Sequence, residues 1–235
     1  MPTEPDPSVL PRQRWRLVVA RSVEVADATQ REVADGWEAA LLGSGLPIAR
    51  GDAGRGRPRI AFAAALPSGV VAAAERIDVV LTQRWPVWRV REAITAVVPD
   101  GWRLVDLDDV WLGAPALPGQ VVAADYRITL GMFSTTVPGG ASQIARACEG
   151  LLAADRLERD RAKGGSVVRY DLRRLVIDLA VAEPGPPVVL RARTRIHPDL
   201  GPGRPEEVVA AIADSIGAEL SISSIERKGL ILADE

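Results

Sequence analysis

The first half of the chain alternates between short apolar segments and amphipathic ones. Strands are expected at residues 14–22, 57–66, 76–81 and 102–112. Between them, Thr29 and Glu32 have the spacing of a capping box and predict a helix that ends before Gly43. A second helix begins at Pro86, with Val90 and Ile94 in its apolar stripe. The predicted order is therefore β-α-β-β-α-β.

The same order returns in the second half, after a segment at residues 113–119 that is rich in proline and glycine. Strands are expected at residues 122–132, 175–181, 188–196 and 220–232, and helices at 141–154 and from Pro205 to Gly217. Residues 155–174 interrupt this order, and we interpret them as an insertion whose charged first part forms a hairpin.

These elements predict an α+β fold of two tandem ferredoxin-like βαββαβ units, each an antiparallel sheet with helices on one face. The first domain is expected at residues 12–113 and the second at 120–235, after a disordered tail at 1–11. The halves share no sequence repeat, so the duplication is inferred from the order of elements alone.

Composition limits the classes of function. A hydrophobic fraction of 47% and a charged fraction of 26% indicate a folded protein. The formal net charge of −2 argues against a surface built entirely for nucleic acid, although it permits local basic patches. Residues 1–11 contain no signal peptide, and no apolar run reaches the roughly 18 residues of a spanning helix. We expect a cytoplasmic protein without a membrane partner.

The sequence predicts no metal, no cofactor and no catalytic centre. An iron–sulfur cluster needs several thiolates and a zinc site several ligands together, but the chain has one cysteine, Cys148, and one histidine, His197. A nucleophile paired with a histidine would depend on the same His197. We expect His197 in a surface loop and Cys148 as a buried thiol.

A basic loop is the main candidate for a binding site. Its arginines are expected to contact RNA phosphates, and the alternative is a solvated connection. They are Arg50, Arg55, Arg57 and Arg59. The loop lacks the Gly-Lys-Ser/Thr ending of a P-loop and precedes a strand, so a nucleotide site is disfavoured.

Two further pairs are candidate RNA contacts. Trp88 and Arg89 lie where tryptophan and arginine interleave, a composition that can stack bases, although packing between a strand and a helix is the alternative. Asp171 and Arg173 belong to the segment RYDLRR, where an internal ion pair that fixes the insertion is the alternative.

Several segments resemble one bacterial family. They are GRPRIAF at 56–62, ALPSGV at 65–70, ERIDVVL at 75–81, YDLR at 170–173 and RKGL at 227–230. The resemblance is to an uncharacterised domain found alone or fused behind cobalamin-binding radical SAM proteins, and it covers the chain from Trp15 onward. Two positions depart from it. Residues 24–27 lack the family's histidine, and residues 52–56 lack its aromatic residue and asparagine.

The resemblance implies a link to a radical SAM enzyme and to RNA processing, but no reaction. Because the chain begins with a short tail, we expect it to act in trans, with such an enzyme as a partner. We therefore expect a non-enzymatic accessory module that binds RNA. The alternatives are an endoribonuclease like those that process CRISPR repeats, which use paired ferredoxin-like domains, and a protein-interaction scaffold.

Overall fold

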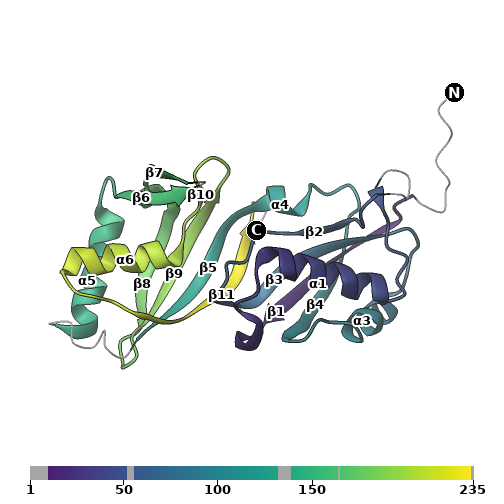
Figure 1. Ribbon diagram of the computed structural model, residues 1–235, viewed down its shortest axis with the longest axis horizontal. Coiled ribbons are helices and arrows are strands. Elements are labelled where there is room, and N and C mark those ends of the chain that lie inside the picture. Colours follow the sequence, from purple (N-terminus) through teal and green to yellow (C-terminus); the bar gives the residue numbers. More distant parts are fainter. Residues whose placement is uncertain (1–9, 52–55, 132–138, 164, 234–235) are drawn as a thin grey trace. The chain divides into compact units, whose positions relative to one another are not determined.

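The computed structural model describes residues 10–51, 56–131, 139–163 and 165–233 (Figure 1). The chain divides into two compact units, with unit 1 running to Val121 and unit 2 beginning at Val122. Most of the expected tail, residues 1–9, lies outside the described residues. The two domain ranges predicted from the sequence stay a prediction.

Unit 1 contains four strands and two main helices. They are β1 (Gln13–Arg21), α1 (Gln30–Gly43), β2 (Ile60–Phe62), β3 (Val70–Leu81), α3 (Val87–Thr95) and β4 (Trp102–Val110), with short turns at η2 (Val23–Val25) and α4 (Leu117–Gln120). The expected capping box starts α1, since the Thr29 side chain accepts from Glu32 N and the Glu32 carboxylate accepts from Thr29 N.

The strands of unit 1 lie in the order β4-β1-β3-β2, and each neighbouring pair is antiparallel. Trp15 pairs with Val79 and Arg16 with Asp78 across β1 and β3. Successive side chains point to opposite faces of a sheet, so these pairs separate two faces of different chemistry.

One face of this sheet forms the core of unit 1. Trp15, Leu17 and Val79 are buried there with Trp37 of α1 and Ile94 of α3. Figure 1 shows α1 lying along these strands. Arg14, Arg16, Asp78 and Val80 have the opposite parity and belong to the other face, which carries the candidate site.

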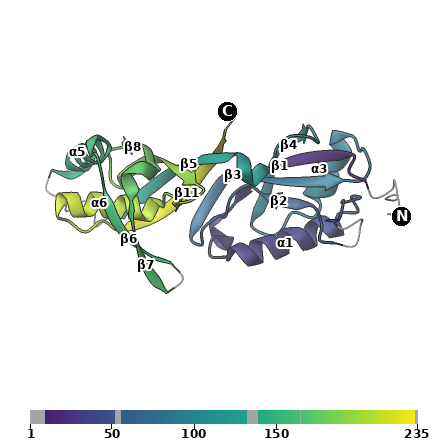
Figure 2. The same ribbon diagram turned by 90° about the horizontal axis from the view of Figure 1, so that it is seen from above.

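Unit 2 repeats the mixture of strands and helices. Its elements are β5 (Val121–Leu130), α5 (Gly140–Ala153), β6 (Glu158–Lys163), β7 (Ser166–Asp171), η4 (Leu172–Leu175), β8 (Val176–Glu183), β9 (Val189–His197), β10 (Gly201–Pro202), α6 (Pro205–Ile216) and β11 (Ile222–Leu232). Strand β9 pairs antiparallel with β5, β8 and β10. Figure 2 shows the β6–β7 hairpin extending outward from beside α6.

The fold thus mixes helices with β-sheet, as expected. The finer description as two plain four-stranded antiparallel units is not confirmed. Unit 2 has the additional strand β10, because Gly201 at φ 76° turns the chain back so that Gly201 and Pro202 pair with His197 and Ile196. The hairpin expected in the insertion is confirmed, because β6 and β7 form a two-stranded sheet of their own. Within the described ranges, no helix combines the length and apolar character needed to cross a bilayer.

Candidate nucleic-acid interface

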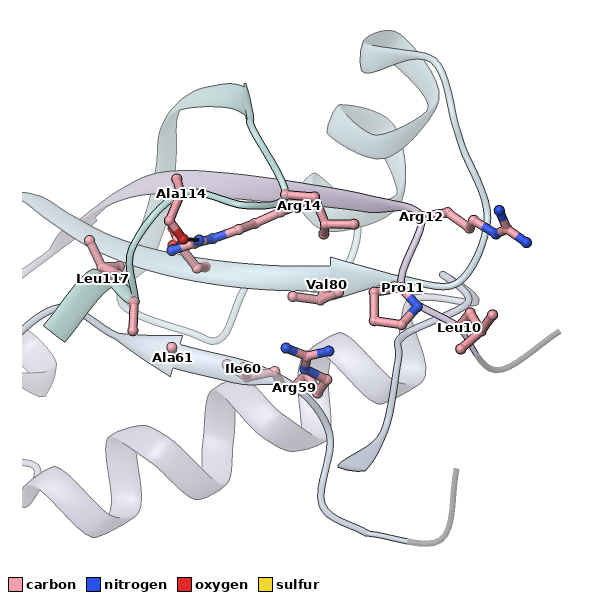
Figure 3. Close-up of a pocket in the computed structure, with 13 residues that line it drawn as sticks. Leu10, Pro11, Arg12, Arg14, Arg59, Ile60, Ala61, Val80, Ala114 and Leu117 are labelled. Atoms are coloured by element: carbon pink, nitrogen blue, oxygen red, sulfur yellow. Dashed lines mark hydrogen bonds and ion pairs between the residues drawn. The ribbon is translucent and has the colours of Figure 1, made fainter. Parts of the chain in front are cut away.

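A groove of about 660 Å³ lies on the face of the unit 1 sheet opposite α1 and α3 (Figure 3). Val80 of β3, Ile60 of β2, and Leu112 and Leu117 beyond β4 give it apolar walls. Arg12, Arg14, Arg59 and Asp78 are its charged lining residues. The groove therefore combines an apolar interior with an excess of positive charge.

A buried ion cluster forms one side of the groove. Asp78 Oδ2 accepts from Arg14 Nε at 2.8 Å, and Asp78 Oδ1 accepts from Arg16 Nε at 2.8 Å. The strand register explains the cluster, because Arg16 faces Asp78 directly and Arg14 lies two residues away on the same face. Two guanidinium groups share one carboxylate, so the cluster carries a net charge of +1.

Arg14 also holds the chain that follows β4 against the sheet. Its Nη1 donates to the carbonyl of Ala114 at 2.8 Å, and its Nη2 donates to that of Pro115 at 3.0 Å. Figure 3 shows Arg14 reaching toward Ala114. We call residues 111–117 the strap. Because Arg14 fixes the strap, Leu112 and Leu117 become a wall of the groove.

Two exposed arginines flank the groove. Arg59 is held by its backbone, with its N donating to Ala49 O at 2.8 Å and its O accepting from Val80 N at 3.1 Å. Arg12 N donates to Leu81 O at 2.8 Å where the chain enters β1. Neither guanidinium has an ion-pair partner within the part of the chain that the structure describes. Both are available to an external anion.

The predicted basic loop lies beside this groove. Arg50 forms a bridge with Pro58, and Gly51 N donates to Arg57 O at 3.0 Å, so the two ends of the loop are joined. Arg57 and Arg50 are exposed. The structure thus brings Arg50, Arg57 and Arg59 to one edge of unit 1, while Arg55 lies outside the described residues.

Trp88 and Arg89 are not part of the groove. Both lie on α3, which packs on the opposite face of the sheet. Arg89 lies over the ring of Trp85, 4.0 Å from its centroid, and Trp88 is 65% exposed. The aromatic residue near the groove is a different one, Trp111, which the sequence did not single out.

Asp171 and Arg173 lie in unit 2, and their side chains form hydrogen bonds with its main chain. Asp171 Oδ1 accepts from Leu157 N at 2.8 Å and from Arg173 N at 3.1 Å. Arg173 donates to the carbonyls of Leu152 and Val176 at 3.0 and 2.7 Å. These contacts connect the insertion to α5 and β8, so the two residues are occupied structurally and are not gathered with the basic loop.

His197 forms hydrogen bonds with the backbone, and Cys148 is buried. His197 Nδ1 accepts from the backbone N of Asp199 at 3.2 Å and of Leu200 at 3.3 Å, which fixes a turn. Burial raises the pKa of the Cys148 thiol to about 11, which disfavours the reactive thiolate. Across the described ranges, His, Cys, Asp and Glu side chains nowhere gather in threes suited to a metal ion.

Sequence reasoning missed Arg12, Arg14, Asp78 and Trp111. Trp111 is 77% exposed, and its ring lies over Gly113, where a Cβ would be 2.6 Å from Trp111 Cζ2. Gly113 stands between the groove-lining residues Leu112 and Ala114, and Trp111 directly precedes Leu112, so Trp111 adjoins the groove lining in the chain. Alternation along β1 puts Arg14 and Arg16 on one face, but their pairing with Asp78 comes from the register of β1 with β3.

Solved structures match the chain over most of its length. One chain of a Cbf5-Nop10-Gar1 complex matches with a TM-score of 0.50 and 11% identity, over 91% of this chain and 48% of that one. An H/ACA RNP bound to a substrate RNA containing 2'-deoxyuridine matches with a TM-score of 0.44 and 14% identity, over 89% and 46%. An unknown protein from Galdieria sulphuraria matches with a TM-score of 0.26 and 12% identity, over 90% and 98%.

The chain spans about half the length of the first two matched chains. No curated protein matches its sequence. Residues 14–202 match the family described as "Uncharacterized protein conserved in bacteria (DUF2344)", so the chain belongs to this bacterial family.

Proposed function

We propose that unit 1 binds RNA through its groove and that the chain is a non-catalytic accessory module. The observation that carries the proposal is the pair of exposed guanidinium groups, Arg12 and Arg59, which flank an apolar groove without an acidic partner among the described residues. An arginine fork matches the oxygens of a phosphate, and nucleic-acid affinity depends largely on such contacts.

The surroundings of this pair favour the same ligand. The buried cluster of Arg14, Arg16 and Asp78 adds a net positive charge to the same face. Arg50 and Arg57 add further exposed charge at the neighbouring edge. The protein as a whole has a net charge of −2, so this local excess of positive charge favours a polyanion as the ligand.

The proposal assigns no chemistry to the chain. The Asp78 carboxylate is held between two guanidinium groups, and the imidazole of His197 accepts from two backbone amides in the other unit. Neither is arranged as a free general base beside the groove.

We also propose the finer features expected from the order of elements and from the family resemblance. Each unit is interpreted as a ferredoxin-like domain, which the strand order β4-β1-β3-β2 supports for unit 1.

The partner is taken to be a radical SAM enzyme acting on the bound RNA. Two of the segments that carry the resemblance supply Arg59, Asp78 and Val80 to the groove. Co-elution with a cobalamin-binding radical SAM protein of the same genome tests this link, and separate elution contradicts it.

A salt titration tests RNA binding. We expect a double change of Arg12→Ala and Arg59→Ala to make the slope of log affinity against log salt shallower by about 0.7 for each lost phosphate contact of a single strand. Arg31→Ala is the matched control, because Arg31 is 91% exposed on α1, away from the groove, and pairs with Asp35. Equal slopes for all three proteins, or no binding by the unchanged protein at low salt, would favour the scaffold alternative.

A further inference from the structure

We infer that the groove of unit 1 receives an unpaired base, with Trp111 stacking on a neighbouring base, so that the ligand is single-stranded RNA. This inference rests on the proposed RNA binding and specifies its ligand. Phosphate contacts alone would require only Arg12 and Arg59, and they leave the apolar interior of the groove unexplained.

The size and lining of the groove suit a base. Its volume of about 660 Å³ lies within the range of sites that enclose small organic molecules. Ile60, Val80, Leu112 and Leu117 offer apolar contact, and Arg59 offers charge at one side. A nucleotide has a comparable division, because the flat faces of its base make apolar contacts and its phosphate is anionic.

The same geometry excludes a duplex as the preferred ligand. Bases inside a duplex are stacked and paired, so they cannot enter a groove enclosed between a sheet and the strap. Bases of a single strand can be turned out and inserted, which is how most sequence-reading RNA sites work. The strap is already held by Arg14, and the groove needs no rearrangement to accept such a base.

Trp111 offers an exposed aromatic ring next to the groove-lining residue Leu112 in the chain. Its ring is backed by Gly113, and Ala114 N donates to Trp111 O at 2.9 Å, which closes the turn beneath it. The side chain is nevertheless 77% exposed. An aromatic ring that is this exposed is available to stack on a base.

The test compares two labelled oligonucleotides of equal length and charge, one ordinary single-stranded RNA and one with abasic sites, by fluorescence anisotropy at fixed salt. We expect the unchanged protein to bind the abasic strand roughly tenfold more weakly, as befits the loss of a stacked base. A duplex of the same sequence should also bind more weakly.

Two variants locate the effect. Trp111→Ala should bind ordinary RNA more weakly and lose much of the distinction between the strands. Trp88→Ala changes another exposed tryptophan, on α3, and should behave as the unchanged protein. Ala61→Leu, which fills the groove from β2 without altering charge, should reduce the distinction as well.

The outcomes separate the inference from the function on which it rests. Equal binding of ordinary and abasic RNA, together with a shallower salt slope for the arginine variant, would overturn the base pocket and keep the RNA-binding proposal. Loss of the distinction in Trp88→Ala instead of Trp111→Ala would overturn the assignment to the groove. Absence of binding to either strand would overturn both.

Discussion

Arg14 and Asp78, which lie 64 residues apart in the sequence, form a buried ion pair whose side chains are 8% and 3% exposed. Arg14 donates in addition to the carbonyls of Ala114 and Pro115. The pair therefore joins β1, β3 and the strap. The wall of the groove depends on it.

Removal of the carboxylate should be costly. Asp78→Ala leaves the guanidinium groups of Arg14 and Arg16 buried without an acid, and breaking a buried pair from one side costs about 3–5 kcal/mol. Urea unfolding measures the change in free energy. The matched control is Asp35→Ala, which breaks an exposed pair with Arg31 and should cost less than about 1 kcal/mol. Similar losses for both variants would contradict the role of the cluster.

Gly113→Ala should displace the ring of Trp111. The added methyl group would lie 2.6 Å from Trp111 Cζ2, so the ring must move. We expect RNA affinity to fall as it does for Trp111→Ala, with a shifted tryptophan emission and little loss of stability. Gly119→Ala is the control in the same stretch, because a Cβ there meets no atom within 4 Å. An unchanged affinity in Gly113→Ala would argue against the stacking role.

The contact of the insertion with α6 should weaken in acid. Burial raises the pKa of Glu207, but hydrogen bonds from Arg161 and Tyr170 and the charge of Arg161 outweigh it, and the net pKa is lowered. A lowered pKa contributes stability above the unfolded value near 4.5, and this contribution is lost as the pH falls through the folded pKa.

Glu207→Gln isolates this effect, since glutamine stays neutral at every pH. The difference in unfolding free energy between the unchanged protein and the variant should be larger at neutral pH than at pH values below the folded pKa. Burial and the hydrogen bond to Glu207 raise the pKa of Tyr170 to about 12, so its own contribution is complete at neutral pH and is lost only as the pH rises from about 10 to about 12. If the difference in unfolding free energy between the two proteins did not change with pH, it would contradict this role of Glu207.

His197→Ala should leave RNA binding and its salt slope unchanged, because His197 lies in unit 2 and its Nδ1 accepts from the backbone of a turn. The purified protein should not cleave RNA, with or without divalent metal. Gel electrophoresis of labelled RNA checks this. Cleavage that disappears in the His197→Ala variant would support the endoribonuclease alternative.

Local patterns predicted local structure well. The spacing of Thr29 and Glu32 gave the start of α1, and the stripe of Val90 and Ile94 identified the buried side of α3. The basic loop was found because its charges are adjacent in the sequence. In contrast, the pairing of Arg14 with Asp78 depends on the register of two strands whose paired residues are 64 positions apart, and so does the hold of Arg14 on the strap. Such relationships are set by tertiary packing, which the order of residues does not display.

The sharing of one acid by two bases has an evolutionary consequence. Loss of Arg16 would leave Arg14 and Asp78 as a neutral pair that still holds the strap, whereas loss of Asp78 would strand two like charges. Drift should therefore be tolerated first at position 16, and a lineage could abandon the acid at 78 only after both arginines had been replaced. Substitutions at positions 14, 16 and 78 should therefore be accepted in a particular order.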